Sequence, residues 1–223
     1  MKTIIISTVL LCTSAWAQSP VAVEFEPHHK TVFADKTLRV LDVVVPEEAA
    51  TLDHTHNFDI ATVCIDCAVT QTKSPGEAWS SARNREVGGV LVAEYAGRPA
   101  AHAVRNVGKG LYRLIAVENL RSSGWPAVTP SSANSATAPS EETRSFRVYD
   151  IRLTAGVGPT QHTHSVPTVV VLVAGDAATS DATKNAARRL SQPGEWQVVP
   201  AGSSHGLSAP YGRAAHLVEI EVR

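Results

Sequence analysis

The chain has 223 residues, of which 43% are hydrophobic and 18% are charged, and its formal net charge is −1 at pH 7. This composition provides enough apolar surface for one large or two small domains, and it is unlike that of a disordered chain. Because the charge is nearly balanced and no run of Lys or Arg occurs, we expect no nucleic-acid partner.

Residues 1–17 have the pattern of a secretory signal peptide. Lys2 supplies the positive start, residues 4–12 form a short apolar core, and Ala15-Trp16-Ala17 is an A-x-A cleavage site. A lipoprotein signal through Cys12 is disfavoured, because the bulky Leu11 stands where a small residue is expected. The apolar run is too short to span a bilayer. We therefore expect cleavage after Ala17, a secreted or periplasmic mature chain, and no membrane partner after cleavage.

The predicted elements of the first half are short strands separated by turns. Residues 19–36 are expected to be irregular, with His28 and His29 as a solvated pair, and residues 73–87 are expected to form a loop. Strands are predicted over 37–45, 54–69, 89–94 and 111–118.

The Cys-Ile-Asp-Cys sequence, Cys64 to Cys67, lies near the end of the second of these strands. It is compatible with a redox pair, half of a zinc site or a local link. No second cysteine pair follows, and no helix begins here, so a local disulfide or two inert thiols are favoured. Export to an oxidising compartment leads us to predict the disulfide.

A linker and a second series of strands follow. Residues 121–143 are rich in Ser, Ala, Thr and Pro, which is typical of a linker. Strands are then predicted over 146–153, 162–174, 194–199 and 214–222, and a short helix over 181–190 within a polar segment. An all-β fold of the sandwich or barrel type is indicated.

The two halves repeat one pattern at an offset of 108 residues. Asp53-His54-Thr55-His56 matches Gln161-His162-Thr163-His164, and the sequence LRVLD at 38–42 matches FRVYD at 146–150. Downstream, the segment that ends at His102 matches the turn that ends at His205, five residues out of register. A repeat of this length indicates two similar domains, at 18–120 and 144–223, joined by the linker at 121–143.

Six of the nine histidines fall in these matched segments. Alternate residues of a strand share one face, so the two histidines of each H-x-H point the same way. Three imidazoles that converge inside an apolar barrel predict a metal site rather than ordinary core histidines. The predicted metal ligands are His162, His164 and His205 in the second half, and His54, His56 and His102 in the first. His216 aligns with Arg113 and is expected to be structural.

These motifs resemble those of the cupins, which pair H-x-H with a P-x-G-x-x-H turn. Pro200 to His205 has the complete turn, whereas Gly97 replaces the proline before His102, and Asn106 follows that histidine at the family's spacing. The resemblance implies an all-β fold of two tandem cupin-type jelly-roll β-barrels, a bicupin. The family's glutamate is replaced by Ile60-Ala61 and by Thr168-Val169. The chain therefore resembles three-histidine cupins, some of which are iron dioxygenases, more than the oxalate-degrading members.

Three neutral ligands favour a divalent transition metal ion, Fe, Zn, Cu or Ni, over Mn or Mg. We expect the ion in the second half first, because its turn is complete, and we expect affinity to fall below about pH 6.5, where free imidazole protonates.

Three functions fit these observations. The first is a metal-dependent, dioxygenase-type oxidoreductase that acts on a small organic substrate at His162, His164 and His205, with no catalytic residue assigned. The second is a non-catalytic protein that binds a metal or a small ligand. The third is a structural role with one degenerate half. A small-molecule partner is expected, and a homo-oligomer is compatible with the sequence.

Overall fold

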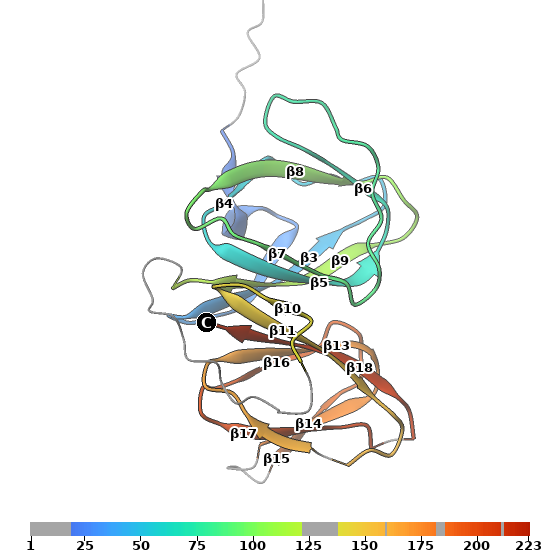
Figure 1. Ribbon diagram of the computed structural model, residues 1–223. Helices are drawn as coiled ribbons and strands as arrows, with labels where there is room; N and C mark the ends of the chain where they lie inside the picture. The colour runs from blue at the N-terminus through green and yellow to red at the C-terminus, as the bar shows by residue number, and fades with distance from the viewer. Residues whose placement is uncertain (1–18, 122–137, 159, 182–185, 211) are drawn as a thin grey trace, which may run out of the picture.

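The computed structural model describes residues 19–121, 138–158, 160–181, 186–210 and 212–223. These residues form an all-β fold in which the one helical segment described is the short 3-10 turn η1 (Val23–Phe25). Figure 1 shows the strands of residues 19–121, the first half, above those of residues 138–223, the second half. Among the described residues, no helix is long and apolar enough to cross a membrane.

Each half consists of a five-stranded and a four-stranded sheet. In the first half the strand orders are β2-β3-β9-β5-β7 and β1-β4-β8-β6. The bounds are β1 (Val21–Ala22), β2 (His29–Ala34), β3 (Leu38–Val45), β4 (His54–His56), β5 (Asp59–Cys67), β6 (Thr70–Lys73), β7 (Val90–Ala93), β8 (Ala100–Asn106) and β9 (Tyr112–Asn119).

The second half repeats this arrangement. Its strand orders are β10-β11-β18-β13-β16 and β12-β17-β14-β15. The bounds are β10 (Glu141–Glu142), β11 (Phe146–Leu153), β12 (Thr160–Thr163), β13 (Thr168–Gly175), β14 (Ala177–Asp181), β15 (Ala186–Leu190), β16 (Trp196–Val199), β17 (Ser204–Ser208) and β18 (Ala215–Val222).

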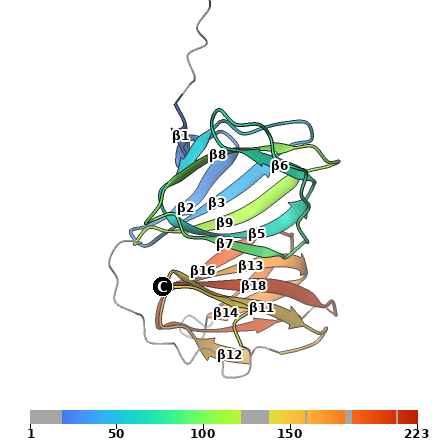
Figure 2. The same cartoon turned by 45° about the horizontal axis from the view of Figure 1, so that its top comes forward.

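The two five-stranded sheets pack against each other at the centre of the molecule (Figure 2). Strand β9 is covered on both of its faces. Ile115 and Val117 belong to the core shared by both halves, whereas Leu114 and Ala116 face the interior of the first half. Alternate side chains of a strand lie on opposite faces, so a sheet that is covered on both faces needs nearly continuous apolar strands. The valine-rich β13, with Val169 and Val171 in the shared core and Val170 inside the second half, meets that need.

Equivalent contacts join the two halves. Gly88 of the first half lies against the ring of His216, and Gly194 of the second half lies against the guanidinium of Arg113. Arg113 donates to Asp42 at 2.9 and 3.0 Å, and His216 contacts the equivalent Asp150 at 2.6 Å. His216 is therefore structural, as predicted, although it has a partner that the sequence did not suggest.

Two predicted segments differ from the structure. Residues 19–36 were expected to be irregular but contain β1, η1 and β2, and His29 is buried rather than solvated. The helix expected over 181–190 is also wrong, because Ala186–Leu190 is strand β15 and pairs with β14. Leu190 is fully buried, so tertiary packing outweighs the helical preference of an Ala- and Arg-rich stretch.

Other predictions are confirmed or lie outside the described residues. Cys64 and Cys67 form a disulfide at the end of β5. The signal segment at 1–17 lies outside the described residues, and the linker at 121–143 is described only at its ends, where β10 already pairs with β11.

Candidate metal centres

The structure brings the six predicted histidines together in two clusters, one in each half. In the first half, β4 carries His54 and His56, and β8 places His102 directly opposite His54. The three ring centroids lie 4.6 to 5.0 Å apart, and one nitrogen of each ring lies within 4.8 Å of the others. That these histidines bind a metal remains a prediction, but their geometry meets its first requirement.

Two ring nitrogens of the first-half cluster are buried without a hydrogen-bond partner among the described residues. The Nδ1 atom of His54 donates to the carbonyl of Leu52 at 2.9 Å, so its Nε2 carries the lone pair. This Nε2 and the Nδ1 of His56 are the two buried nitrogens. Burial lowers the pKa of His54 to about 3 and that of His56 to about 2, and the neighbouring histidines add to the shift. Buried lone pairs on neutral rings fit a bound cation well.

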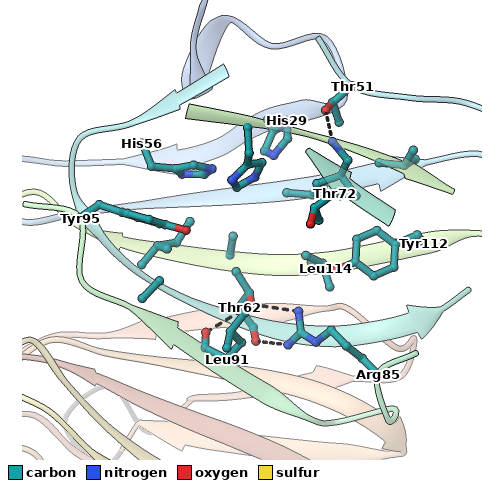
Figure 3. A pocket seen from close by; sticks show the side chains of 17 residues that line it. His29, Thr51, His56, Thr62, Thr72, Arg85, Leu91, Tyr95, Tyr112 and Leu114 are labelled. Carbon is teal, nitrogen blue, oxygen red and sulfur yellow. Dashed lines mark hydrogen bonds between the residues drawn. The ribbon is translucent and has the colours of Figure 1, made fainter. Parts of the chain in front are cut away.

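A cavity of about 140 Å³ opens beside this cluster (Figure 3). His56 and His102 line it, and the ring of Tyr95 stacks on His56 with centroids 5.0 Å apart. Its other walls are largely apolar. The further lining residues are His29, Val43, Val45, Thr51, Thr62, Thr72, Arg85, Leu91, Ala93, Val104, Tyr112, Leu114 and Ala116.

Arg85 is the cation in the cavity wall. Its guanidinium donates to the hydroxyl and the carbonyl of Thr62 at 3.1 and 2.9 Å, and to the carbonyl of Gly89 at 2.9 Å. All three acceptors are neutral, so these bonds fix the group without neutralising its charge.

The second-half cluster includes a carboxylate. His162 on β12 lies opposite His205 on β17, and the chain then places His164 beside both. Glu219 of β18 reaches all three rings, at 3.2 Å from Nε2 of His162, 3.3 Å from that of His205 and 3.7 Å from that of His164. These four side chains are 5% exposed or less. Three imidazoles and a carboxylate could hold a transition metal in a buried site.

The expectation of a site without a carboxylate is therefore wrong for the second half. The motif position indeed lacks a glutamate, but the last strand supplies one. The only signal in the sequence was LVEIEV of β18, where Glu219 and Glu221 alternate with apolar residues and so share one face of the strand. With a carboxylate ligand, Mn also becomes compatible with this site.

Glu221 holds His164 in place. Its Oε1 accepts from Nδ1 of His164 at 2.7 Å, while Arg147 donates to its Oε2 at 3.1 Å. Burial alone would lower the pKa of His164, but the hydrogen bonds to Glu219 and Glu221 outweigh burial and raise it to about 9. A metal bound here must displace a proton at neutral pH, unlike one bound in the first half.

His29 is a residue near the first-half cluster that the sequence analysis missed. It begins β2, and its ring centroid lies 4.5 Å from that of His54. A position beside another histidine, in a segment expected to be irregular, gave no periodic signal.

The chain is similar to known proteins in its fold, at sequence identities of 11 or 12% to three solved structures. No protein-family model and no curated protein matches the chain. The Leptotrichia buccalis structure described as a cupin 2 conserved barrel domain protein has a TM-score of 0.58 at 11% identity, with 87% of this chain and 88% of that chain covered. AerE from Microcystis aeruginosa has a TM-score of 0.61 at 12% identity, with 90% and 99% covered. A salicylate 1,2-dioxygenase mutant from Pseudoaminobacter salicylatoxidans, in complex with gentisate, has a TM-score of 0.64 at 12% identity, with 91% and 76% covered.

Proposed function

Because the chain has the cupin fold, in two tandem jelly-roll barrels, we propose that it is a metal-binding bicupin that oxidises a small organic substrate with dioxygen. The observation that carries the proposal is the cavity that shares His56 and His102 with the first-half cluster. The sequence alone favoured the second-half histidines for the reaction. The cavity leads us to place it at the first half.

The size of the cavity limits the substrate. A cavity of about 150 Å³ holds one benzene molecule, so about 140 Å³ has room for a single ring or a compound of similar size. The structural neighbour in complex with gentisate supports this class, since it is a dioxygenase seen with a small organic ligand. Arg85 adds a fixed positive charge at the wall, which favours a substrate that carries a carboxylate.

The residues around the cavity would bind and orient this substrate. A divalent transition metal, Fe(II) for this class of reaction, would supply a Lewis acid with positions for dioxygen and substrate. The stacked Tyr95 and the apolar side chains of Ile60 and Leu114 exclude water from the cavity. Thr62, held by Arg85, limits how the polar end of the substrate can lie.

A different role is favoured at the second half. Its four candidate ligands are buried, and a closed set of protein ligands is typical of a structural metal. We propose that this ion stabilises the second half without turnover. If the first half also binds without turnover, the alternative function holds for the whole chain. Both halves would then bind a metal or a small ligand without catalysis.

The test uses nitric oxide as a surrogate for dioxygen. Protein loaded anaerobically with Fe(II) should give an iron–nitrosyl spectrum that is lost in His102→Ala. Salicylate should shift this spectrum in the wild type. Ala93→Phe, which fills the cavity, should keep the adduct and lose the shift. Fe(II) that does not bind, or that binds and gives no adduct, would contradict the oxygenase proposal, and an adduct with no salicylate effect would contradict the proposed substrate class.

We also propose that the chain is exported. The signal-like residues 1–17 motivate this, and the Cys64–Cys67 disulfide supports an oxidising compartment. The intact mass of the exported protein should correspond to a chain that begins at Gln18, and a mass that retains Met1 to Ala17 would contradict cleavage there.

A further inference from the structure

We propose that His29 is a fourth imidazole ligand of the first-half metal site, held in position by Glu26. This inference rests on the proposed metal binding of His54, His56 and His102. It adds a residue that comes from β2, outside both sequence motifs.

Glu26 fixes the tautomer of His29. The Nδ1 atom of His29 lies 2.5 Å from Oε2 of Glu26, whose side chain is fully buried. The same carboxylate accepts from the backbone N–H groups of His28 and Leu52, at 2.8 and 3.1 Å. A carboxylate that accepts these bonds is an acceptor toward the ring as well, so Nδ1 carries the hydrogen and Nε2 of His29 keeps its lone pair. A carboxylate on the far nitrogen is the usual partner of a metal-binding histidine.

Glu26 also ties His29 to His54. The carboxylate binds the N–H of Leu52, and the carbonyl of Leu52 accepts from Nδ1 of His54. Two adjacent rings, 4.5 Å apart, are therefore both held with their Nε2 lone pairs available. Two lone pairs side by side repel each other unless a cation lies between them.

His29 lies outside the group of three histidines whose ligand atoms are within 4.8 Å of one another, so its ring would have to shift toward them when the metal binds. His29 is 8% exposed and lines the cavity together with His56 and His102. Its ring centroid lies 6.4 Å from that of His56, farther than the 4.6 to 5.0 Å within the three-histidine cluster, so it lies at the edge of the cluster. Figure 3 shows His29 and His56 on the same side of the cavity, across from Thr62 and Arg85.

Each half would then have four metal ligands, and the fourth would come from a different strand in each half. The last strand supplies Glu219 in the second half, whereas Ala116 occupies the equivalent position in β9 and only lines the cavity. The first half would replace the missing carboxylate with an imidazole from β2. An ion that accepts six ligands keeps positions for small molecules with four imidazoles bound.

The experiment measures Co(II) and Zn(II) binding in full-length protein that carries His162→Ala, so that the first-half site reports alone. In that background, His29→Ala should weaken Zn(II) binding at least about tenfold and alter the visible Co(II) spectrum, and Glu26→Gln should weaken binding about 10–100-fold. X-ray absorption of the Zn(II) protein should show one imidazole fewer in His29→Ala. Free imidazole added to His29→Gly should restore the Co(II) spectrum, which a folding defect would not allow.

His28→Ala is the matched control, because His28 contacts the carbonyl of Val44 and lies outside the cluster. It should leave the affinity and the spectrum unchanged. Unchanged affinity and spectrum in His29→Ala would overturn the inference while leaving the three-histidine site intact. Absence of Co(II) and Zn(II) binding in the His29-containing background would overturn the proposed first-half site itself.

Discussion

Glu221 and Glu118 occupy equivalent places on the last strands of the two halves, and each pairs with an equivalent arginine. Arg147 donates to Glu221 and Arg39 to Glu118. The second oxygen of Glu221 binds a histidine, His164, whereas the second oxygen of Glu118 is buried without a hydrogen-bond partner among the described residues. Comparison of the two glutamates therefore distinguishes a structural ion pair, at Glu118, from a contact that orients a candidate metal ligand, at Glu221.

Replacement of these glutamates by glutamine should distinguish the two roles. Both Glu221→Gln and Glu118→Gln should lower the free energy of unfolding, because removal of one partner of a buried ion pair costs up to about 3–5 kcal/mol. Only Glu221→Gln should weaken metal binding in its own half, by about 10–100-fold. Zn(II) titration and denaturant unfolding of both variants check this. Equal losses of affinity in the two variants would show that the effect is one of stability alone.

The candidate ligands were predictable where a local motif carried them. H-x-H in a strand puts two imidazoles on one face, and this was enough to name His54, His56, His162 and His164. Glu219 reaches its site from a strand 57 positions after His162, and no local spacing encodes that approach. Which face of β18 turns inward depends on which sheet it joins, and the sequence pattern left that open.

Two loop glycines lie at the contact between the halves, and each has a backbone conformation that disfavours other residues. Gly88 has φ +82°, and a Cβ there would lie 2.3 Å from Cε1 of His216. Gly194 has φ +84°, and a Cβ there would lie 2.8 Å from Cζ of Arg113. Gly76 has φ +77°, and a Cβ there would meet no described atom within 4 Å, so it has the same conformation without the contact.

Alanine substitutions at Gly76 and Gly88 should separate the cost of backbone strain from the cost of disturbing the contact with His216. Gly76→Ala should cost about 1–2 kcal/mol of unfolding free energy, from the left-handed backbone alone. Gly88→Ala should cost about 1–3 kcal/mol more, because the methyl group must displace His216 at the junction of the halves. Thermal and denaturant unfolding of the two variants give the difference. Equal losses would mean that the His216 contact contributes nothing to the packing of the halves.

Most strands followed from composition and alternation, and those that did not are short or lie at edges. β3 and β18 were predicted within a residue or two because most of their residues are buried and they are rich in Val, Leu and Ile. β2 and β15 are edge strands with polar residues. Each pairs with a single strand close in sequence, β2 with β3 and β15 with β14, and the polar residues of both hide the strand pattern.

The whole molecule is two similar barrels with a shared core and two sites of different electrostatics. The 108-residue repeat predicted the duplication, and the structure places the repeated histidines equivalently. The differences between the sites come from residues outside the repeat's motifs. Carboxylates surround the second-half cluster, whereas apolar residues and an open cavity surround the first.

This difference predicts that metal affinity depends on pH differently in the two halves. In the first half, burial lowers the pKa of His54 to about 3, of His56 to about 2 and of His102 to about 4. These rings stay neutral well below pH 6.5, so affinity should be flat from pH 9 to about pH 5 and fall only as pH approaches 4. In the second half, the pKa of His164 is raised to about 9, so each metal ion must displace a proton below that pH. Affinity there should rise with pH up to about 9, by up to about tenfold per pH unit.

Single-site variants make the two dependences measurable. His162→Ala leaves the first-half site, and His102→Ala leaves the second-half site, so competition titrations with Zn(II) between pH 5 and pH 9 report each in turn. From pH 9 to pH 7, we expect a loss of up to about 100-fold in the second half and little change in the first. The sequence alone predicted one common fall below about pH 6.5, as for free imidazole. If both variants follow that single curve, burial and the two glutamates do not set the protonation of these sites, and the proposed division between a buried structural ion and an accessible reactive one loses its electrostatic basis.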